Sequence, residues 1–332
     1  MTLEEVARQA GVSTATVSRV LNNPSIVKEA TRLRVLAAAK KLNYRPNRYA
    51  QGLAGGRSRT LGVIVSNIEN PYFLDILHSL EERAAKAGLE LVYENTDYSP
   101  QRLAAAVELM LARPLAGLAV MVSENEPEAV RQLIEWGRPV VVTDLCEAQG
   151  AIAQIKIRYE QAMRRAVEYL YGLGHRRMAF VGHHQALDSL REREHAFSAT
   201  MKRYRDVEHA AASSEDSPAG GRTAAHELLS SGFRPTAVLC VNDFMAIGVL
   251  RELREEGLRV PEDVSVAGFD NIQLAEYLNP SLTTVNIPRR RIGEAIFEAL
   301  APQERQQRPP ARILIDPELV VRESTAPPPA LQ

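Results

Sequence analysis

A run of side chains near the N-terminus could contact a nucleic acid duplex. Residues 13–19 contain four hydroxyl groups, one guanidinium group and one small methyl side chain, with a single valine among them. Hydroxyl and guanidinium groups form hydrogen bonds with phosphates and base edges, and a methyl group suits contact with a thymine methyl. The segment is therefore a candidate DNA-reading surface. Its candidate residues are Ser13, Thr14, Ala15, Thr16, Ser18 and Arg19.

The elements that must position these side chains are short helices. The sequence predicts helices over 3–10, about 14–21 and about 28–42, with Thr2 capping the first helix and Gly11 ending it. Two short helices joined by a glycine turn have the spacing of a helix-turn-helix motif. The alternative is a helical hairpin whose polar face is only solvated. The third helix is expected to pack through an apolar stripe of Leu33, Leu36, Ala37 and Leu42.

Charge is distributed unevenly along the chain. Residues 1–59 hold eleven Lys and Arg against three Glu, a net charge of +8, which leaves −9 for the rest of a chain whose total is −1. A basic head on an acidic body indicates that the head meets a polyanion.

The composition of the sequence indicates where in the cell the protein is expected. No apolar run is long enough to span a membrane, and the first residues do not resemble a secretory signal. Cys146 and Cys240 lie in separate strand-like runs, so we expect buried thiols in the cytoplasm, and neither a disulfide nor a metal site.

From residue 60 onward, buried strands alternate with amphipathic helices. The pattern predicts an α/β core of two doubly wound lobes behind the small all-α headpiece. We expect a headpiece over 1–46, a hinge helix and linker over 47–59, a core over 60–325 whose second lobe starts near residue 158, and a disordered tail over 326–332. Strands are predicted over 61–66, 89–95, 117–122, 139–144, 178–182, 237–242 and 264–269, and residues 283–288 and 313–321 are expected to cross back between the lobes.

Polar and aromatic residues follow several of these strands. The carboxyl ends of parallel strands meet at one edge of a sheet, where open α/β folds bind ligands. Asn242 could instead cap the following helix, and Asp144 could only close a loop. The first lobe offers Asn70, Tyr72, Phe73, Ser123 and Asp144, and the second lobe offers Arg193, Asn242 and Asp270.

Many segments in one order resemble the lactose/galactose-repressor family of bacterial transcription regulators. The resemblance covers almost the whole chain and includes Val6-Ala7-Arg8-Gln9-Ala10-Gly11-Val12-Ser13 in the headpiece. The matching stretches are residues 3–13, 16–22, 42–47, 70–73, 174–177, 234–238, 242–248, 260–270 and 282–285.

The resemblance implies roles in the headpiece and hinge. Thr14 and Ala15 would be the specificity pair in the major groove, and Ser13, Thr16, Ser18 and Arg19 would support them through base or phosphate contacts. Asn47 and Arg48 would also contact DNA. Residues 48–53 would form a hinge helix only on operator DNA, with Leu53 as the apolar wedge at a minor-groove step.

For the core, the resemblance implies a fold like that of periplasmic sugar-binding proteins, with no cofactor and a ligand between the lobes. Arg193 and Asp270 would hold the ligand through hydrogen bonds, and Tyr72 and Phe73 would stack on it. An Arg beside an Asp suits a sugar or sugar acid.

The chain departs from the family pattern at two places near this expected cleft. Arg158 and Tyr159 stand where the family usually has Asp-Asn. Asp216 lies near the place of a missing aromatic residue. These departures leave open an unusual ligand or a weakened response.

These observations favour a ligand-gated repressor that binds a palindromic operator as a dimer. The chain has no leucine-heptad tail, so we expect a dimer rather than a tetramer. The resemblance leaves open whether the small molecule releases DNA or strengthens its binding. A solute-binding protein without a genetic role is one alternative, but it would lack the basic headpiece. An enzyme is the other, but no phosphate loop, Gly-x-Ser-x-Gly elbow or metal spacing is present.

Overall fold

The structure is a computed structural model that describes residues 2–22, 26–44, 58–143, 152–184, 188–301 and 312–329. The chain divides into two compact units, Met1–Arg59 and Thr60–Gln332. In the described residues the first unit is helical, and the second alternates strands with helices around two sheets. The predicted fold class, a helical headpiece and two doubly wound α/β lobes, is confirmed. No helix in these described ranges is both long and apolar enough to cross a membrane.

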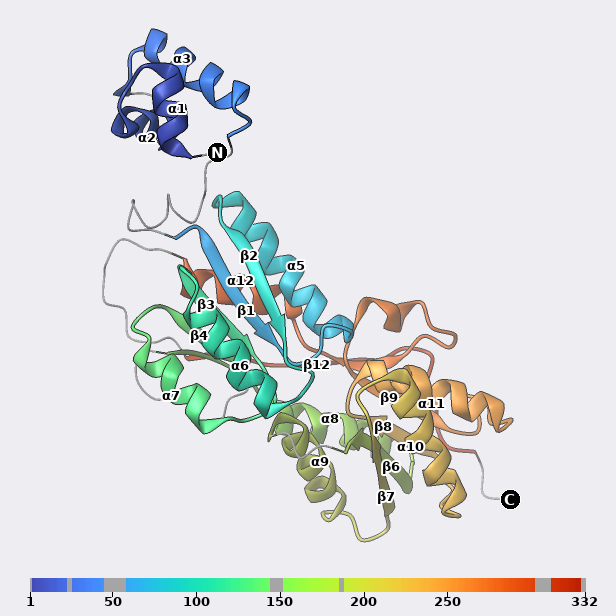
Figure 1. Ribbon diagram of the computed structural model, residues 1–332. Helices are drawn as coiled ribbons and strands as arrows, with labels where there is room; N and C mark the ends of the chain where they lie inside the picture. Colours follow the sequence, from blue (N-terminus) through green and yellow to red (C-terminus); the bar gives the residue numbers. More distant parts are fainter. Residues whose placement is uncertain are drawn as a thin grey trace. The chain divides into compact units, whose positions relative to one another are not determined.

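The first unit contains α1 (Leu3–Ala10), α2 (Thr14–Asn22) and α3 (Glu29–Lys41) (Figure 1). The Glu5 N–H donates to the Thr2 hydroxyl oxygen, and the Thr2 N–H donates to the Glu5 carboxylate, which together form a capping box. Gly11 ends α1 with φ 63°, a left-handed conformation that favours glycine. This turn sets the start of α2 relative to α1.

The small core of this unit corrects one prediction. The expected apolar stripe on α3 is wrong at three of its four residues, since Leu33 and Leu36 are 55% and 42% exposed and Ala37 is also exposed. The fourth, Leu42, is partly buried and packs against the core. The helix instead buries a neighbouring stripe with two alanines, whose small side chains let α3 approach α1 and α2 closely. The buried residues are Val6, Ala7, Ala10, Val17, Val20, Val35, Ala38 and Ala39.

The first lobe of the second unit is a six-stranded sheet covered on both faces. Helices α5 (Pro71–Lys86) and α12 (Arg289–Leu300) pack together on one face, and α6 (Pro100–Leu111) and α7 (Pro127–Glu135) on the other. Val63 and Ile64 of one strand accordingly belong to different core clusters. In sheet order the strands are β11 (Arg312–Ile315), β5 (Ala153–Ile157), β4 (Val140–Thr143), β3 (Gly117–Met121), β1 (Thr60–Val65) and β2 (Glu90–Asn95).

The second lobe repeats this plan (Figure 1). Helices α8 (Tyr159–Gly172) and α9 (Asp188–Met201) pack as one pair, and α10 (Pro218–Ser230) and α11 (Asp243–Glu255) as another. Among the described strands of both lobes, every pairing is parallel except that of β10 with β12. In sheet order the strands are β12 (Glu318–Val320), β10 (Thr283–Asn286), β9 (Ser265–Asp270), β8 (Ala237–Cys240), β6 (Arg177–His183) and β7 (Glu208–Ser214).

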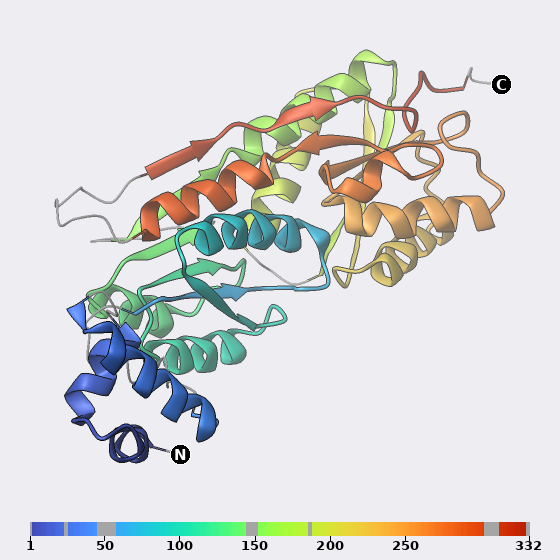
Figure 2. The ribbon, with the colours of Figure 1, turned by 90° about the horizontal axis from the view of Figure 1, so that it is seen from above.

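In the described parts of the chain, the backbone crosses between the lobes three times. The crossings lie between β5 and α8, between β10 and α12, and between β11 and β12. Figure 2 shows the last crossing, where the two red C-terminal strands follow one another from the first lobe to the second. Three separate stretches of chain thus connect the two lobes.

Every predicted strand overlaps an observed one, but β5, β7, β10, β11 and β12 were not predicted as strands. The last three lie in the segments 283–288 and 313–321, which were expected to cross between the lobes. β7 is an edge strand of sequence Glu-His-Ala-Ala-Ala-Ser-Ser, which lacks the β-branched residues typical of strands. β5 alternates buried and half-buried residues and contains Gln and Lys, so it lacks a continuous apolar run that would indicate a buried strand.

The disordered tail was expected to start at residue 326, but Ala326 is ordered. The Ala326 N–H donates to Ser265 Oγ (3.0 Å), and the Ala326 carbonyl oxygen accepts from the Ser265 hydroxyl (3.0 Å). The same oxygen lies 2.9 Å from His175 Nε2. Hydrogen bonds therefore hold Ala326 against the second lobe.

Candidate functional site

Helix α2 presents most of the predicted DNA-reading residues on one side. Thr14 and Ser18, like Ala15 and Arg19, are four residues apart and share a helix face. Thr14, Ala15 and Arg19 are exposed, and Ser18 is half-buried. The opposite side carries the buried Val17 and Val20. The helix thus has an apolar side that anchors it and a polar side open to a partner.

Ser13 and Thr16 have a structural role at the start of α2. The Thr16 N–H donates to Ser13 Oγ (3.2 Å), and the two hydroxyl oxygens lie 3.0 Å apart. Ser13 therefore caps the helix whose first turn carries the candidate reading pair. Asn47, Arg48 and Leu53 lie outside the described residues, as does the candidate cleft residue Asp144.

The structure brings the other seven candidate cleft residues together around one cavity between the two lobes of the core. These seven are Asn70, Tyr72, Phe73, Ser123, Arg193, Asn242 and Asp270. The cavity has a volume of only about 30 Å³. Typical small-molecule sites measure roughly 300–1,000 Å³, so the cleft is closed in this conformation.

Helix caps place two of these residues at the sheet edges. Asn70 follows β1, and its side-chain oxygen accepts from the Tyr72 N–H (3.0 Å) at the start of α5. Asn242 follows β8, and its oxygen accepts from the Met245 N–H (2.8 Å) at the start of α11. Each capping oxygen fixes its side chain, so that the amide nitrogen faces the cleft. Asn242 is therefore both a cap and a cleft residue.

Arg193 is held inside the cleft by stacking as well as by a hydrogen bond. Its Nη1 donates to the Val241 carbonyl oxygen (2.8 Å), and its guanidinium carbon lies 4.2 Å from the ring centre of Tyr159 and 4.9 Å from that of Phe269. Tyr159, one of the departures from the family pattern, thus fills space in the cavity wall. Arg158 instead faces outward and pairs with Asp316 (2.9 Å).

Asp270 is a buried acid with spare hydrogen-bonding capacity. Its Oδ1 forms no hydrogen bond with any described residue and lies 3.9 Å from Arg193 Nη1. Burial raises the pKa of Asp270 well above its ordinary value, although the nearby Arg193 opposes the shift. This carboxyl group can accept or donate a hydrogen bond to a ligand that enters the cleft.

Asp216 lies at the centre of the contact between the lobes. The Asn242 amide donates to its Oδ1 (2.6 Å) from the same lobe, and the Asn70 amide donates to its Oδ2 (3.2 Å) from the other lobe. The Tyr98 hydroxyl also donates to Oδ2. The sequence placed Asp216 only near the cleft, whereas the structure buries it there with 7% exposure.

Tyr98 is a cleft residue that the sequence analysis missed. It follows β2, so the rule that selected residues after other strands would also have selected it. Tyr98 and Asp270 both line the cavity and have positive φ values of 56° and 104°. A non-glycine residue in this region costs roughly 1–3 kcal/mol, and such residues cluster at binding sites.

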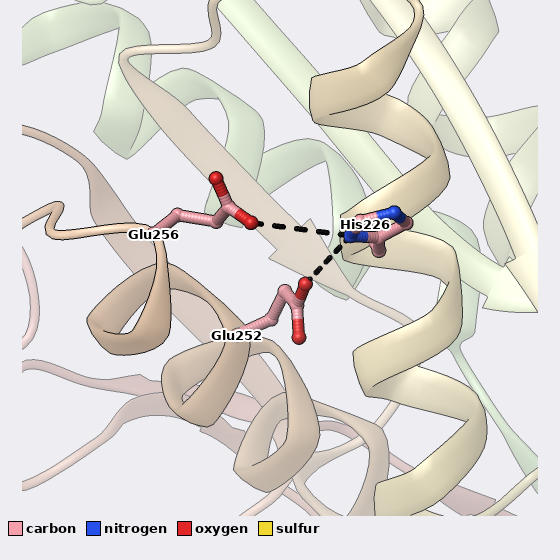
Figure 3. Close-up of side chains that lie close together, drawn as sticks. All are labelled: His226, Glu252 and Glu256. Atoms are coloured by element: carbon pink, nitrogen blue, oxygen red, sulfur yellow. Dashed lines mark hydrogen bonds and ion pairs between the residues drawn. The ribbon is translucent and has the colours of Figure 1, made fainter.

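A second group of side chains in the second lobe has the composition of a metal site. His226, Glu252 and Glu256 have potential ligand atoms within 4.8 Å of one another (Figure 3). However, Glu252 also accepts from Arg222 Nε (2.8 Å), while its other oxygen lies 2.8 Å from His226 Nδ1. Because a guanidinium group already neutralises Glu252, we interpret the group as an ion-pair link between α10 and α11.

Sequence comparison matches one family model in each unit. Residues 2–47 match the family described as bacterial regulatory proteins, lacI family, and residues 167–325 match a periplasmic binding protein-like domain. The HTH-type transcriptional repressor PurR of Photobacterium profundum is 32% identical over 334 residues, covering 97% of this chain and 98% of that protein. PurR of Vibrio vulnificus is 34% identical over 328 residues, with 97% and 98% covered. The chain belongs to the LacI family.

Several solved structures of transcription regulators share this fold over 81–98% of the chain. The lac repressor dimer bound to operator and the anti-inducer ONPF has a TM-score of 0.83 at 31% identity, covering 98% of this chain and 99% of that one. A CelR–cellobiose complex has a TM-score of 0.69 at 28% identity, with 98% and 99% covered. A LacI-family regulator from Enterococcus faecium with bound ribose has a TM-score of 0.70 at 26% identity, with 81% and 99% covered.

LacI-family membership selects among the functions that the sequence left open. The N-terminal helices are a LacI-type helix-turn-helix domain, and the second unit is periplasmic-binding-protein-like. The PurR relatives are transcriptional repressors, so this protein is a DNA-binding transcription regulator and not an enzyme.

Proposed function

We propose that this LacI-family protein is a repressor that binds a palindromic operator as a dimer and responds to a small molecule in the inter-lobe cleft. The observation that carries the proposal is the exposed face of α2, where Thr14, Ala15 and Arg19 project from a headpiece that has its own buried core. Thr14 and Ala15 would read base edges, and Arg19 would hold a phosphate or base. Such a protein acts in the cytoplasm, on the chromosome.

A dimer follows from the same geometry. One headpiece reads one half-site, and two copies related by a twofold axis read an inverted repeat. The lac repressor relative is described as a dimer bound to operator, which supports this assembly for the present chain. We further propose that residues 47–59 link headpiece to core, with Asn47 and Arg48 at the DNA backbone and Leu53 at the central minor-groove step.

For the effector we propose a sugar or sugar acid. Asp270 has an oxygen without a hydrogen bond among the described residues, and Arg193 offers fixed donors beside it. Tyr72 and Phe73 pack edge to face at 5.1 Å between ring centres and would contact the flat side of a sugar ring. Two of the similar solved structures, CelR and the Enterococcus faecium regulator, are described with cellobiose and with ribose, which supports the class. The lobes must open to admit such a ligand, because the present cavity is too small.

Selection from a pool of DNA duplexes with a random central segment tests the DNA assignment. Full-length protein should enrich an inverted repeat whose half-site centres lie about one helical turn, roughly 10 base pairs, or a multiple of it apart. Enrichment of a sequence without an inverted repeat would contradict the dimeric operator. A pool that stays random would contradict sequence-specific binding.

Thermal unfolding in the presence of sugars, sugar acids and purines tests the effector class. A ligand at about 100 times its Kd stabilises the folded protein by about 2.7 kcal/mol. A sugar or sugar acid should raise the unfolding midpoint of the wild type, and the Arg193→Ala variant should lose that shift. A shift produced only by purines would contradict the proposed class.

A further inference from the structure

Three of the hydrogen-bond donors that line the cleft are already used by a side chain of the protein itself. Asn70 and Tyr98 from the first lobe and Asn242 from the second all donate to the carboxylate of Asp216. In addition, the Asn67 amide of the first lobe donates to the Asp216 carbonyl oxygen (3.3 Å). A carboxylate has about four acceptor positions, so three donors nearly saturate it.

The small volume that remains in the cleft also indicates that the site is filled. The cavity of about 30 Å³ holds one or two water molecules, and Asn70, Tyr98 and Asn242 all line it. The amide and hydroxyl donors of the cleft that could meet a ligand's polar groups are therefore occupied from within, while Arg193 donates to a backbone carbonyl oxygen and one oxygen of Asp270 has no hydrogen bond among the described residues. Asp216 enters from the short loop between β7 and α10, directly before Ser217 caps α10.

We propose that Asp216 is an internal ligand of the cleft: its carboxylate holds the two lobes together without a bound small molecule, at a site that recognises carboxylates. The proposal deepens the proposed function, because it concerns the cleft in which we place the effector. An effector with a carboxylate would compete with Asp216 for the same three donors. In the wild type such a competitor faces a tethered group at high effective concentration.

Removal of the carboxylate tests this directly in the full-length protein. Asp216→Ala deletes a group the size of formate, so sodium formate at neutral pH is the probe, with sodium chloride at equal ionic strength as the reference. In chloride, the variant should have a larger radius of gyration by small-angle X-ray scattering and a lower unfolding midpoint than the wild type. Formate should return both values toward those of the wild type in a concentration-dependent manner.

Glu215→Ala is the matched control, since Glu215 is the preceding acid on the same loop and is exposed. The wild type and this control should respond equally little to formate. An Asp216→Ala protein as compact as the wild type would overturn the proposal. Expansion that formate does not reverse would overturn the assignment of a carboxylate site.

A double-variant cycle keeps the proposal testable if Asp216→Ala does not fold. Asp216→Asn keeps the size of the side chain but retains one acceptor oxygen, and Tyr98→Phe removes the donor opposite it. If the contact exists in solution, the double variant should lower the unfolding midpoint by less than the sum of the single variants. A fully additive loss would contradict the contact. The scattering and unfolding measurements do not involve DNA. A failure of the operator selection would therefore leave this test of Asp216 unaffected.

Discussion

The Tyr98 hydroxyl in the first lobe donates a hydrogen bond to the carboxylate of Asp216 in the second lobe. Both side chains are buried, with 8% and 7% exposure. Burial raises the pKa of Tyr98 well above its ordinary value, and the neighbouring Asp216 raises it further. The phenol therefore keeps its proton and remains a donor throughout the physiological range. This single contact joins two segments that are 118 residues apart.

Loss of the Tyr98 hydroxyl should destabilise the core. Tyr98→Phe leaves the Asp216 carboxylate buried with one donor fewer, which costs roughly 1–3 kcal/mol. Chemical denaturation of full-length protein should show this decrease in the free energy of unfolding. Tyr93→Phe is the control, because Tyr93 lies on β2 of the same lobe and is 57% exposed. Equal stability of the two variants would show that the lobes do not meet at Tyr98.

The buried acid Asp243 should make stability depend on pH. Burial raises its pKa from 3.8 to about 7, although hydrogen bonds from the Thr284 hydroxyl and the Ile272 N–H oppose the shift. The folded state therefore holds this proton to higher pH than the unfolded state. Its stabilising contribution is complete below about pH 4 and is lost as the pH rises through 7.

The Asp243→Asn variant isolates that contribution, because it cannot titrate. Between pH 5 and 8 the unfolding free energy of the wild type should fall more steeply than that of the variant. The difference should amount to a few kcal/mol at most, at about 1.4 kcal/mol per unit of pKa shift. Asp270, whose pKa is raised by burial and also by the neighbouring Asp243, is present in both proteins. Because Asp243→Asn removes that neighbouring charge, the pKa of Asp270 should be less strongly raised in the variant, which changes the pH dependence in the same direction. Parallel pH profiles would refute a raised pKa at Asp243.

Two glycines hold the helices that follow Asp216 and Asn242 against each other. A Cβ at Gly248 of α11 would lie 1.8 Å from the Pro218 carbonyl oxygen of α10, and one at Gly221 would lie 2.0 Å from the Met245 carbonyl oxygen. Backbone atoms cannot relieve such short contacts without strain, so Gly248→Ala should lower the free energy of unfolding by about 3 kcal/mol or more. It should also separate Asp216 from Asn242.

Gly172→Ala at the end of α8 is the control for this substitution, since no atom lies within 4 Å of the added Cβ. It should leave stability unchanged or raise it by about 0.5–1 kcal/mol through helix propensity. Thermal unfolding of both variants measures the contrast. A Gly248→Ala protein as stable as the wild type would contradict the close approach of α10 and α11.

Much of the cleft could be predicted from the sequence, because local signals determine it. Asn70, Asn242 and Asp270 follow buried strands, and parallel strands bring their carboxyl ends to one edge. The bond between Tyr98 and Asp216 could not be predicted, since it depends on how closely the two lobes approach each other. The stripe on α3 was misjudged because Leu33 and Leu36 are more apolar than the alanines that the packing selects. Burial follows from the space available between helices as well as from hydrophobicity.

The central claim, that the exposed side of α2 reads operator DNA, can be tested with one substitution. Ala15→Glu places a carboxylate on that side within the first turn of the helix, where the helix dipole tolerates an acid. Fluorescence anisotropy with the selected duplex should give a Kd roughly 5- to 150-fold higher than that of the wild type, since one base contact is worth roughly 1–3 kcal/mol. Ala105→Glu, on an exposed position of α6, adds the same charge to the core and should bind like the wild type. Wild-type affinity in Ala15→Glu would contradict the assignment of α2 as the reading helix.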